Sequence, residues 1–365
     1  MRVAHISTVH QRFDNRIFFK EISFLKSFYD ISLIVADGQG NEVVDNIKII
    51  DIGFLEGRLN RILFTSFKML KFLRKSKYDI VHFHDPELLL IAIPLRLFGK
   101  KVIYDSHEDI SKQVFSKNYI PFFLKLIISI TVFFFEKFIS LFINKIICTT
   151  NSIAKSFRFI DSKVYVINNY PYLNELKNNS ILNYANDNKI CYIGTITFKR
   201  GIKEIVRALE LLNGKVYLDL VGTFESDVLF KKVSAMNGWK FVNFLGQLKR
   251  KDLPKIFNSS KVGLVIFHPD PNHIKSQPNK LFEYMSSNLP IVCSDFELWR
   301  DLIEKNKCGL CVNPYDPTEI SKSISKIIND SDMRIQMGKN GRKAIVDSYN
   351  WEKESLKLLD IYKSI

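Results

Sequence analysis

Short apolar runs rich in valine and isoleucine alternate with amphipathic stretches along most of the chain, and these runs predict buried strands. In the first half the predicted strands are 3–7, 31–36, 47–52, the start of 78–86, the start of 101–109, 145–149 and 164–168. In the second half they are 189–193, 216–221, 241–245, 262–267, 290–293 and 309–312. Strands that alternate with helical stretches indicate parallel sheets with right-handed crossovers, so the predicted fold class is α/β.

A polar, asparagine-rich stretch after Tyr170-Pro171 shows little core periodicity and predicts a linker between two Rossmann-like halves. We expect an N-terminal domain at 1–170 and a C-terminal domain at 189–350. The closing segment, 351–365, contains a helix long enough to pack back on the first domain. The other predicted helices include 16–28, 202–212 and 317–328.

Residues 57–78 form a strongly basic amphipathic helix, in which lysine and arginine alternate with leucine and phenylalanine. One interpretation is a solvated outer face over an apolar core stripe. The other is a surface that meets anionic lipid headgroups. The pattern alone leaves both open.

Residues 119–143 are the most apolar region of the chain. A helix that spans a bilayer needs about 20 apolar residues, and Lys125 and Glu136 bound a shorter run than that. We therefore expect a helix that lies in the membrane interface, with a buried core helix as the alternative. The start of the chain lacks a long apolar core of the secretory type, so we expect a cytoplasmic protein, peripheral on the inner face of the plasma membrane.

The amino-acid composition limits the classes of function that the chain can have. At 365 residues with 46% hydrophobic content, the chain is long enough for two globular domains. Its formal net charge of +15 indicates an anionic partner, such as an anionic membrane or a phosphorylated substrate. The alternative is that the charge only keeps the protein soluble. Nucleic acid is not expected, because no nucleic-acid-binding motif is present.

The five cysteines are expected to be reduced and to hold no metal. Cys148, Cys191 and Cys293 lie in strand-like contexts, where burial as thiols is expected. Cys308 and Cys311 have metal-ligand spacing, but no second cysteine or histidine pair accompanies them. We expect neither a metal site nor a cofactor.

Histidines follow several of the predicted strands. His10 belongs to the polar loop 10–15, His84 ends the strand in 78–86, and His107 follows the strand in 101–109. Ligands of open parallel sheets gather beyond the carboxyl ends of the strands, so we expect a functional role for His107. For His84 a structural hydrogen bond is an equal alternative.

The segment 278–295 reads as a loop, a short helix, a turn and a buried strand. Pro278 suits the first turn of a helix, which leaves the next backbone amides free to bind an anion. These are the amides of Asn279, Lys280 and Leu281. Lys280 adds a positive charge, and Glu283 offers acceptor oxygens suited to a ribose diol. A nucleotide site is one interpretation, and an ordinary amphipathic helix is the other.

These residues carry a resemblance to a known family. Glu283 stands where the retaining glycosyltransferases of family 4, which have the GT-B fold, carry the second glutamate of a paired-glutamate motif. The family's glycine loop, a Gly-Arg pair followed by Lys-Gly, resembles Gly194-Thr195 and Arg200-Gly201. The resemblance covers nearly the whole chain and is most specific in 278–290.

Two positions depart from the family pattern. Thr195 replaces the first arginine of the glycine loop, and Lys275 replaces the first glutamate, which contacts the donor sugar. Lys275 either pairs with an acidic donor sugar, such as a uronic acid, or lies in a solvated loop. The glycine-rich first loop common in the family is also absent, replaced by 9–14.

The resemblance implies two Rossmann-like domains that face each other across a cleft, with a nucleotide-sugar donor on the C-terminal domain. It implies that His107 lies near the donor sugar, that Arg200, with Lys199 beside it, binds the diphosphate, and that Glu283 binds the ribose. Metal-independent transfer is expected, because positioned cations can stabilise the departing diphosphate. The expected catalytic residues are His107, Arg200 and Lys280, and the expected donor-binding residues are Gly194, Thr195, Lys275, Asn279, Leu281 and Glu283.

The expected activity is transfer of a sugar from a UDP-sugar, with retention, to a lipid-linked oligosaccharide in bacterial surface-polysaccharide biosynthesis. Two alternatives remain open. The departures at Thr195 and Lys275 would fit a catalytically silent subunit that binds nucleotide sugars. A nucleotide-sugar epimerase of the same architecture would fit the fold, but it would have less use for 57–78 and 119–143.

Overall fold

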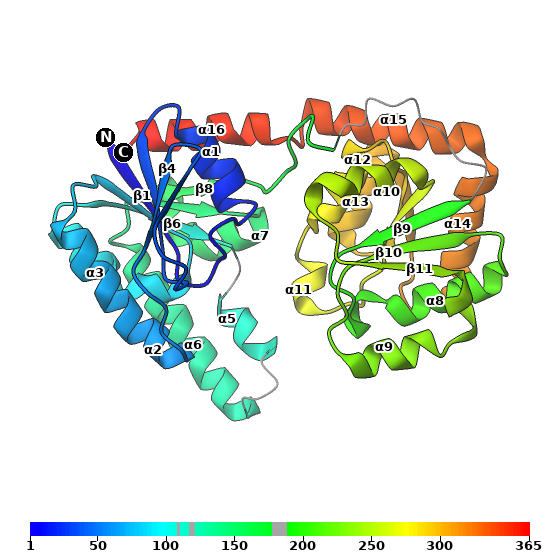
Figure 1. Cartoon of the computed structure of the whole chain (residues 1–365), viewed down its shortest axis with the longest axis horizontal. Coiled ribbons are helices and arrows are strands. Elements are labelled where there is room, and N and C mark those ends of the chain that lie inside the picture. The colour runs from blue at the N-terminus through cyan, green and yellow to red at the C-terminus, as the bar shows by residue number, and fades with distance from the viewer. Residues whose placement is uncertain (108–109, 117–120, 177–187) are drawn as a thin grey trace. The chain divides into compact units, whose positions relative to one another are not determined.

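The computed structural model describes residues 1–107, 110–116, 121–176 and 188–365, which form two compact units (Figure 1). Unit 1 comprises Met1–Asn169 and Lys353–Ile365, and unit 2 comprises Tyr170–Glu352. Each unit is a largely parallel sheet with helices on its faces, which confirms the predicted α/β fold class with two Rossmann-like domains. Most of the expected linker, at 177–187, lies outside the described residues.

The sheet of unit 1 has the strand order β3-β4-β2-β1-β5-β6-β7-β8. Its strands are β1 (Arg2–Ile6), β2 (Asp30–Val35), β3 (Glu42–Val44), β4 (Ile47–Asp51), β5 (Ile80–Phe83), β6 (Lys101–Ser106), β7 (Lys145–Cys148) and β8 (Val164–Val166). Neighbouring strands are parallel except for the edge pair of β3 and β4. The sequence predicts these strands except β3, a short partner of β4 joined to it by a tight turn in which Asp45 and Asn46 have positive φ.

Helical segments cover both faces of this sheet. They are η1 (Ile17–Ile22), α1 (Ser23–Leu25), α2 (Arg58–Asn60), η2 (Arg61–Thr65), α3 (Ser66–Lys75), η3 (Pro86–Ile91), α4 (Ala92–Leu97), α5 (Ile110–Gln113), η4 (Val114–Ser116), α6 (Phe122–Ser140), α7 (Asn151–Ala154), η5 (Lys155–Lys163) and α16 (Trp351–Lys363). The predicted basic helix corresponds to α2, η2 and α3. The predicted apolar helix corresponds to α6, and residues 119–120 of that prediction lie outside the described part of the chain.

The sheet of unit 2 has the order β11-β10-β9-β12-β13-β14, and its neighbouring strands are parallel. Its strands are β9 (Lys189–Ile193), β10 (Tyr217–Val221), β11 (Val242–Gly246), β12 (Val262–Val265), β13 (Ile291–Ser294) and β14 (Gly309–Val312). Its helical segments are η6 (Phe198–Arg200), α8 (Ile202–Leu212), α9 (Asp227–Ser234), η7 (Asn237–Phe241), η8 (Arg250–Asp252), α10 (Leu253–Ser259), α11 (Pro271–Ile274), α12 (Asn279–Ser286), α13 (Glu297–Asn306), α14 (Pro317–Asn329) and α15 (Ser331–Asp347).

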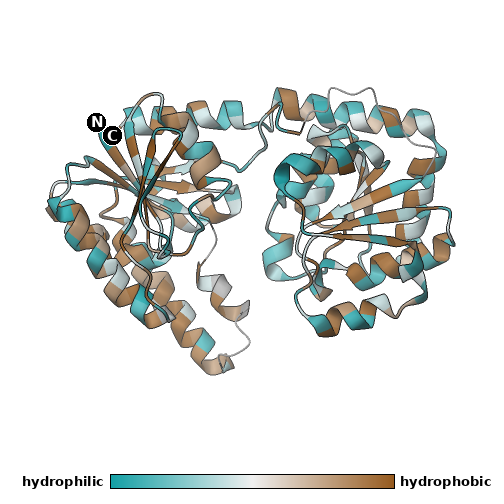
Figure 2. Cartoon of the chain, in the orientation of Figure 1, coloured by the Kyte–Doolittle hydropathy of each residue, from teal (hydrophilic) through white to brown (hydrophobic). Residues whose placement is uncertain are grey.

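Side chains alternate between the two faces of each sheet along its strands, and both faces are buried. In β9, Cys191 and Ile193 pack into one apolar cluster, and Ile190 and Tyr192 pack into the cluster on the opposite face. The apolar strand centres are visible in the hydropathy colouring (Figure 2). The cysteines are unpaired, and Cys311 of β14 lies 3.8 Å from Cys293 of β13 between their sulfur atoms.

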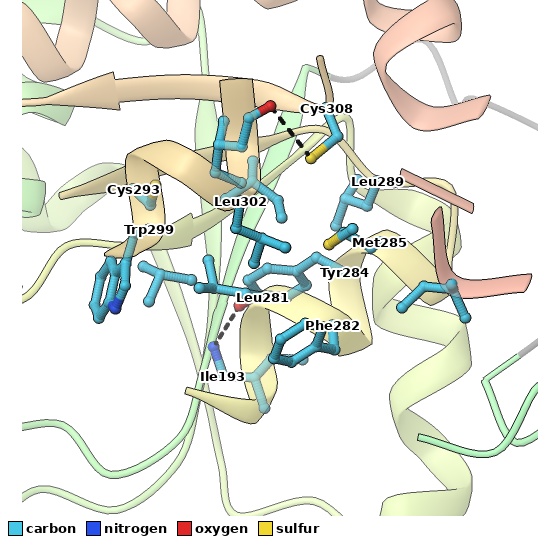
Figure 3. Close-up of a cluster of buried hydrophobic side chains, with 14 of the residues drawn as sticks. Ile193, Leu281, Phe282, Tyr284, Met285, Leu289, Cys293, Trp299, Leu302 and Cys308 are labelled. Atoms are coloured by element: carbon cyan, nitrogen blue, oxygen red, sulfur yellow. Dashed lines mark hydrogen bonds between the residues drawn. The ribbon is translucent and has the colours of Figure 1, made fainter. Parts of the chain in front are cut away.

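Helix α12 is fastened tightly to the sheet of unit 2. Its Tyr284 ring lies over Gly263 of β12, where an added Cβ would come within 2.5 Å of a ring carbon. The hydroxyl of Tyr284 accepts a hydrogen bond from the backbone amide of Ile193, at 3.2 Å (Figure 3). This bond ties α12 to the last residue of β9, immediately before the loop 194–201, so the two segments hold a fixed relation to each other.

Helix α6 is apolar and largely exposed, rather than a core helix. Its exposed apolar residues include Phe122, Phe123, Leu126, Ile127, Ile130, Phe133, Phe134 and Phe138. Its inner side buries Ser129, Glu136, Ile139 and Ser140. No described helix has the length and apolar character needed to cross a membrane.

Candidate nucleotide-sugar site

The carboxyl ends of β9 and β12 meet where the strand order of unit 2 reverses, because β9 is followed in sequence by β10 on one side and flanked by β12 on the other. Such a switch point is where open α/β sheets bind ligands. The loop 194–201 begins at the end of β9, and the segment that leads to α12 begins at the end of β12. Both predicted anion-binding segments therefore lie at the same edge of one sheet.

Two of the predicted catalytic cations converge on Gly194. A Cβ at Gly194 would lie 3.5 Å from Cε of Lys280 and 3.6 Å from Nη1 of Arg200. The Arg200 guanidinium donates to the backbone oxygen of Thr195 at 3.3 Å and lies 5.1 Å from the centre of the Phe267 ring. Both positive charges therefore lie beside the same stretch of backbone.

The loop 194–201 has a backbone that requires glycine at its end. Gly201 has φ +64°, and an added Cβ would lie 2.3 Å from the backbone oxygen of Ile266. The preceding turn is capped by Thr197, whose hydroxyl accepts the amide of Arg200 at 3.1 Å. Arg200 is thus held by the turn at its backbone and by Thr195 at its side chain.

Glu283 is buried, with 3% of its surface exposed, and is paired with two cations. Its carboxylate accepts a hydrogen bond from Nζ of Lys280 at 2.9 Å and from Nη1 of Arg250 at 2.9 Å. Burial by itself raises the pKa of Glu283, but the charges of Lys280 and Arg250 outweigh it and lower the pKa to about 2. Glu283 is therefore ionised at neutral pH.

Arg250 belongs to the candidate site through its contact with Glu283 and was not predicted from the sequence. It bonds both Glu283 and Glu175, and the pKa of its guanidinium is raised by these carboxylates although burial opposes this. A sequence signal existed, because Arg250 lies in the basic run Lys249-Arg250-Lys251 shortly after a predicted strand. Parallel strands bring such positions to the ligand-binding edge.

One expected donor amide is not free. The amide of Leu281 donates to the backbone oxygen of Pro278 at 3.1 Å, and the Leu281 side chain is buried in the core, so the expectation of a free Leu281 amide is wrong. The reason is that Pro278 caps α12 instead of occupying its first turn. Asn279 and Lys280 are the first residues of α12, and their amides have no acceptor within the helix.

The remaining predicted donor residues of unit 2 are exposed. Thr195 is exposed, and its backbone oxygen accepts from Tyr192 at 2.9 Å as well as from Arg200. Lys275 is exposed and directly follows α11. Lys199 pairs with Asp270 at 2.6 Å, which makes it less available to a ligand than its neighbour Arg200.

His107 lies in unit 1, beyond the carboxyl end of β6, and its side chain is 20% exposed. Its Nε2 lies 3.3 Å from Oδ2 of Asp105 and 3.4 Å from Nδ1 of His84. Arg16 contacts the same Asp105 through Nε at 2.9 Å and Nη2 at 3.2 Å. Asp105 is buried, which would raise its pKa, but the charges of Arg16 and His107 hold the pKa well below its usual value.

The first loop of unit 1 is organised by a second buried carboxylate. Oδ2 of Asp85 accepts the amides of Thr8 at 2.6 Å and Val9 at 3.3 Å, and the hydroxyl of Ser7 at 2.9 Å. His10 lies in this loop, and its ring centre is 4.9 Å from that of His107. The loop after β1 and the loop after β6 therefore meet at His107.

Among the described residues, two groups of side chains could hold a metal ion. One group is His5, Glu21, His82 and His84, and the other is His84, Asp105 and His107.

Glu283 is expected to make unit 2 less stable at acid pH. Its native pKa of about 2 lies below the ordinary value of 4.5, so its ion pairs stabilise the native state above pH 4.5, and this contribution is lost as the pH falls from 4.5 toward 2. The shift corresponds to about 3 kcal/mol. The free energies of unfolding of the wild type and of Glu283→Gln, measured in urea, should differ strongly at neutral pH and little near about pH 2. A difference that does not change with pH would contradict this assignment.

Comparison with known proteins agrees with the fold. Residues 26–170 match the family model described as Glycosyltransferase Family 4, and residues 174–344 match the model described as Glycosyl transferases group 1. The structure of HepE from Anabaena in complex with UDP-glucose superimposes with a TM-score of 0.77 at 15% identity, covering 100% of both chains.

Curated relatives match over shorter segments. The O-antigen chain mannosyltransferase B of Escherichia coli is 26% identical over 180 residues, 47% of this chain and 45% of the relative. The UDP-Gal:alpha-D-GlcNAc-diphosphoundecaprenol alpha-1,3-galactosyltransferase of Escherichia coli is 25% identical over 150 residues, 41% of this chain and 35% of the relative. The matched segments thus span about half or less of the length of these relatives. The two family models, which together cover most of the sequence, and the two Rossmann-like units show that this chain belongs to the glycosyltransferases of the GT-B fold.

Proposed function

We propose that the protein is a retaining glycosyltransferase that moves a sugar from a UDP-sugar to a membrane-linked oligosaccharide during the synthesis of a surface polysaccharide such as O-antigen or capsule. The observation that carries this proposal is the convergence of Arg200 and Lys280 on Gly194, beside the buried carboxylate of Glu283. These residues lie in the unit that matches the Glycosyl transferases group 1 model.

The chemistry of the site suits a nucleoside diphosphate. Arg200 offers a guanidinium fork, Lys280 offers a point charge, and the first amides of α12 offer further donors to phosphate oxygens. Glu283 uses one oxygen for Lys280 and the other for Arg250, but each carboxylate oxygen has a second lone pair that a ribose hydroxyl can reach. HepE was crystallised with UDP-glucose, and the name of the Escherichia coli galactosyltransferase specifies UDP-Gal, which supports a uridine nucleotide.

In the proposed reaction, the bond between the anomeric carbon and the diphosphate oxygen breaks and a bond to the acceptor hydroxyl forms on the same face. The acceptor proton passes to an oxygen of the departing diphosphate. Arg200 and Lys280 stabilise the negative charge that develops on the diphosphate, which is the role that a metal ion has in other transferases. His107, held by Asp105, orients the donor sugar.

The lipid-linked acceptor is supported by an exposed apolar and basic surface on unit 1. Helices α3 and α6 both contact the segment η3, so they belong to the same region of the unit. The consecutive segments α2, η2 and α3 expose both apolar and basic side chains. The exposed apolar residues are Leu59, Leu63, Phe64 and Phe67, and the exposed lysines are Lys68, Lys71 and Lys75. Exposed leucine and phenylalanine next to lysine is typical of surfaces that bind anionic bilayers.

Flotation with liposomes tests this membrane surface. Wild-type protein should float with vesicles that contain phosphatidylglycerol and remain unbound with neutral vesicles. Each lysine near an anionic surface contributes about 1 kcal/mol, so Lys68→Ala combined with Lys71→Ala should lower the partition coefficient about 10- to 30-fold. The matched control removes Lys231 and Lys232, which are exposed on α9 of unit 2. Equal losses for both pairs would refute a specific surface on α3.

Incubation with a panel of nucleotide sugars tests the activity. Thermal shift identifies the donor, since a ligand that binds only the native state raises the melting temperature. Mass spectrometry then detects transfer of the sugar to a polyprenyl-diphosphate-linked acceptor, and NMR of the product gives the anomeric configuration. Donor binding without transfer would favour the silent subunit, and interconversion of the nucleotide sugar without acceptor would favour the epimerase.

A further inference from the structure

Four potential metal ligands meet inside unit 1, on the face of the sheet opposite the apolar cluster that contains Ala4, Val81 and Tyr104. His5 of β1 and His82 of β5 are direct neighbours in the parallel register. His84 comes directly after β5, two residues after His82, and so projects to the same face as His82. Glu21 comes from η1, and one ligating atom of each residue lies within 4.8 Å of each of the others.

The polar atoms of this cluster differ in whether they have a partner. The Glu21 carboxylate is ion-paired with Arg16, whose Nε lies 2.9 Å from Oε1, and it also interacts with the Asp105 carboxyl group. Nε2 of His82 has no partner among the described residues. All four side chains are buried, with exposures of 0 to 1%. A buried polar group without a partner costs about 1–3 kcal/mol, so Nε2 of His82 beside the Glu21 carboxylate favours a ligand at this place.

The other ring nitrogens of the histidines are occupied. The hydroxyl of Tyr362 lies 2.7 Å from Nδ1 of His82 and 3.0 Å from Nε2 of His5. Nδ1 of His84 lies 3.4 Å from the carboxylate of Asp105. Nδ1 of His5 and Nε2 of His84 are hydrogen-bonded to each other at 3.0 Å. A bound ion would replace this bond and contact both nitrogens together with Nε2 of His82. In metal-binding histidines, the ring nitrogen that does not bind the metal usually forms a hydrogen bond with an oxygen atom, which fixes the orientation of the ring.

We propose that His5, His82, His84 and Glu21 form a structural binding site for a divalent transition metal ion of the zinc class. Three imidazole nitrogens and one carboxylate oxygen are a ligand set that Zn²⁺ takes in tetrahedral geometry. Nδ1 of His5 and Nε2 of His84 lie 3.0 Å apart, close to the edge of about 3.3 Å that tetrahedral ligands at zinc distances would have.

The ion would fix the base of the His107 loop rather than touch a substrate. It would link β1, β5 and η1, and His84 would connect it to Asp105 and His107. The inference therefore goes beyond the proposed function and holds whether or not the protein transfers a sugar. It places a metal in unit 1, whereas the residues proposed to bind the diphosphate belong to unit 2.

The test measures metal in the purified protein. Full-length chain, purified without a polyhistidine tag and dialysed against Zn²⁺ and then buffer, should retain about one ion per chain by plasma mass spectrometry. Removal by a chelator should lower the melting temperature by about 5 °C or more, and added Zn²⁺ should restore it. His82→Gln and Glu21→Gln should lose both the ion and the response to Zn²⁺.

His10→Gln and His273→Gln control for binding by unrelated histidines and should keep the ion. His107→Gln separates the two possible ligand groups, because His107 belongs only to the group with His84 and Asp105. Where His82→Gln does not fold, Co²⁺ added to metal-free wild type should give the visible absorption of a four-coordinate nitrogen and oxygen site. Wild type with less than about a tenth of an ion per chain, or loss of the ion in His107→Gln with retention in His82→Gln, would overturn the proposal.

Discussion

Replacement of Arg200 or Lys280 by alanine is expected to lower the rate of sugar transfer about 100-fold in each case, the scale found when one group that stabilises developing charge is removed. Both cations lie beside Gly194, where we place the diphosphate. Arg200 contacts Thr195 and Phe267 at the edge of the unit, so its loss should leave the fold intact. Lys280 also pairs with Glu283, but Arg250 still neutralises that carboxylate in Lys280→Ala.

Turnover at saturating donor, with the melting temperature measured in parallel, separates loss of chemistry from loss of structure. Arg207→Ala provides the matched control, because Arg207 is an exposed arginine of α8 in the same unit. Lys199→Ala should have a smaller effect than Arg200→Ala, since Lys199 already pairs with Asp270. If Arg200→Ala and Lys280→Ala both turn over at near-normal rates, the diphosphate does not bind at Gly194.

Gly222→Ala is expected to destabilise unit 2 by roughly 3 kcal/mol or more, from a steric clash combined with an unfavourable backbone conformation. Gly222 follows β10 with φ +144°, and an added Cβ would lie 1.9 Å from the backbone oxygen of Gly194. Relief of this clash would move the carboxyl end of β9 away from β10. The substitution should therefore also weaken donor binding, although Gly222 itself contributes no side chain to the site.

Gly246→Ala is the matched control for this prediction. Gly246 is the last residue of the neighbouring strand β11, has φ +65°, and has no heavy atom within 4 Å of an added Cβ. Alanine at Gly246 should lower the free energy of unfolding by only about 1 kcal/mol, the cost of a left-handed backbone conformation for a residue with a side chain. Urea unfolding of both variants measures the difference. Equal destabilisation would show that backbone conformation, rather than close approach to Gly194, requires glycine at Gly222.

The strands were predictable because their pattern is local. The runs 189–193 and 309–312 coincide with β9 and β14, and the helix 202–212 coincides with α8. The strand predicted at 262–267 ends earlier, at Val265. Beyond it the amide of Phe267 bonds to the hydroxyl of Ser294, and the amide of His268 bonds to the backbone oxygen of Lys199. Such partners are distant in sequence, so a strand end is less predictable than its centre.

The candidate site was predictable in part. Gly194, Arg200, Lys280 and Glu283 were identified by their position after predicted strands and by resemblance to a family motif, and the structure brings them together within unit 2. The role expected for the Leu281 amide was wrong, because the amide closes the first turn of α12 onto Pro278. Whether a proline caps a helix or begins it depends on the chain that precedes it, which the local sequence does not specify.

The amino-acid sequence by itself determined the alternation of strands and helices, the division into two Rossmann-like domains and the placement of the charged residues after strands. These follow from periodicity, which is a property of neighbouring residues. Only the tertiary structure decided that Arg250 neutralises Glu283 and that His5, His82 and His84 meet beside Glu21. Each of these contacts joins segments that are far apart in sequence, and their geometry depends on strand order and register, which periodicity does not encode.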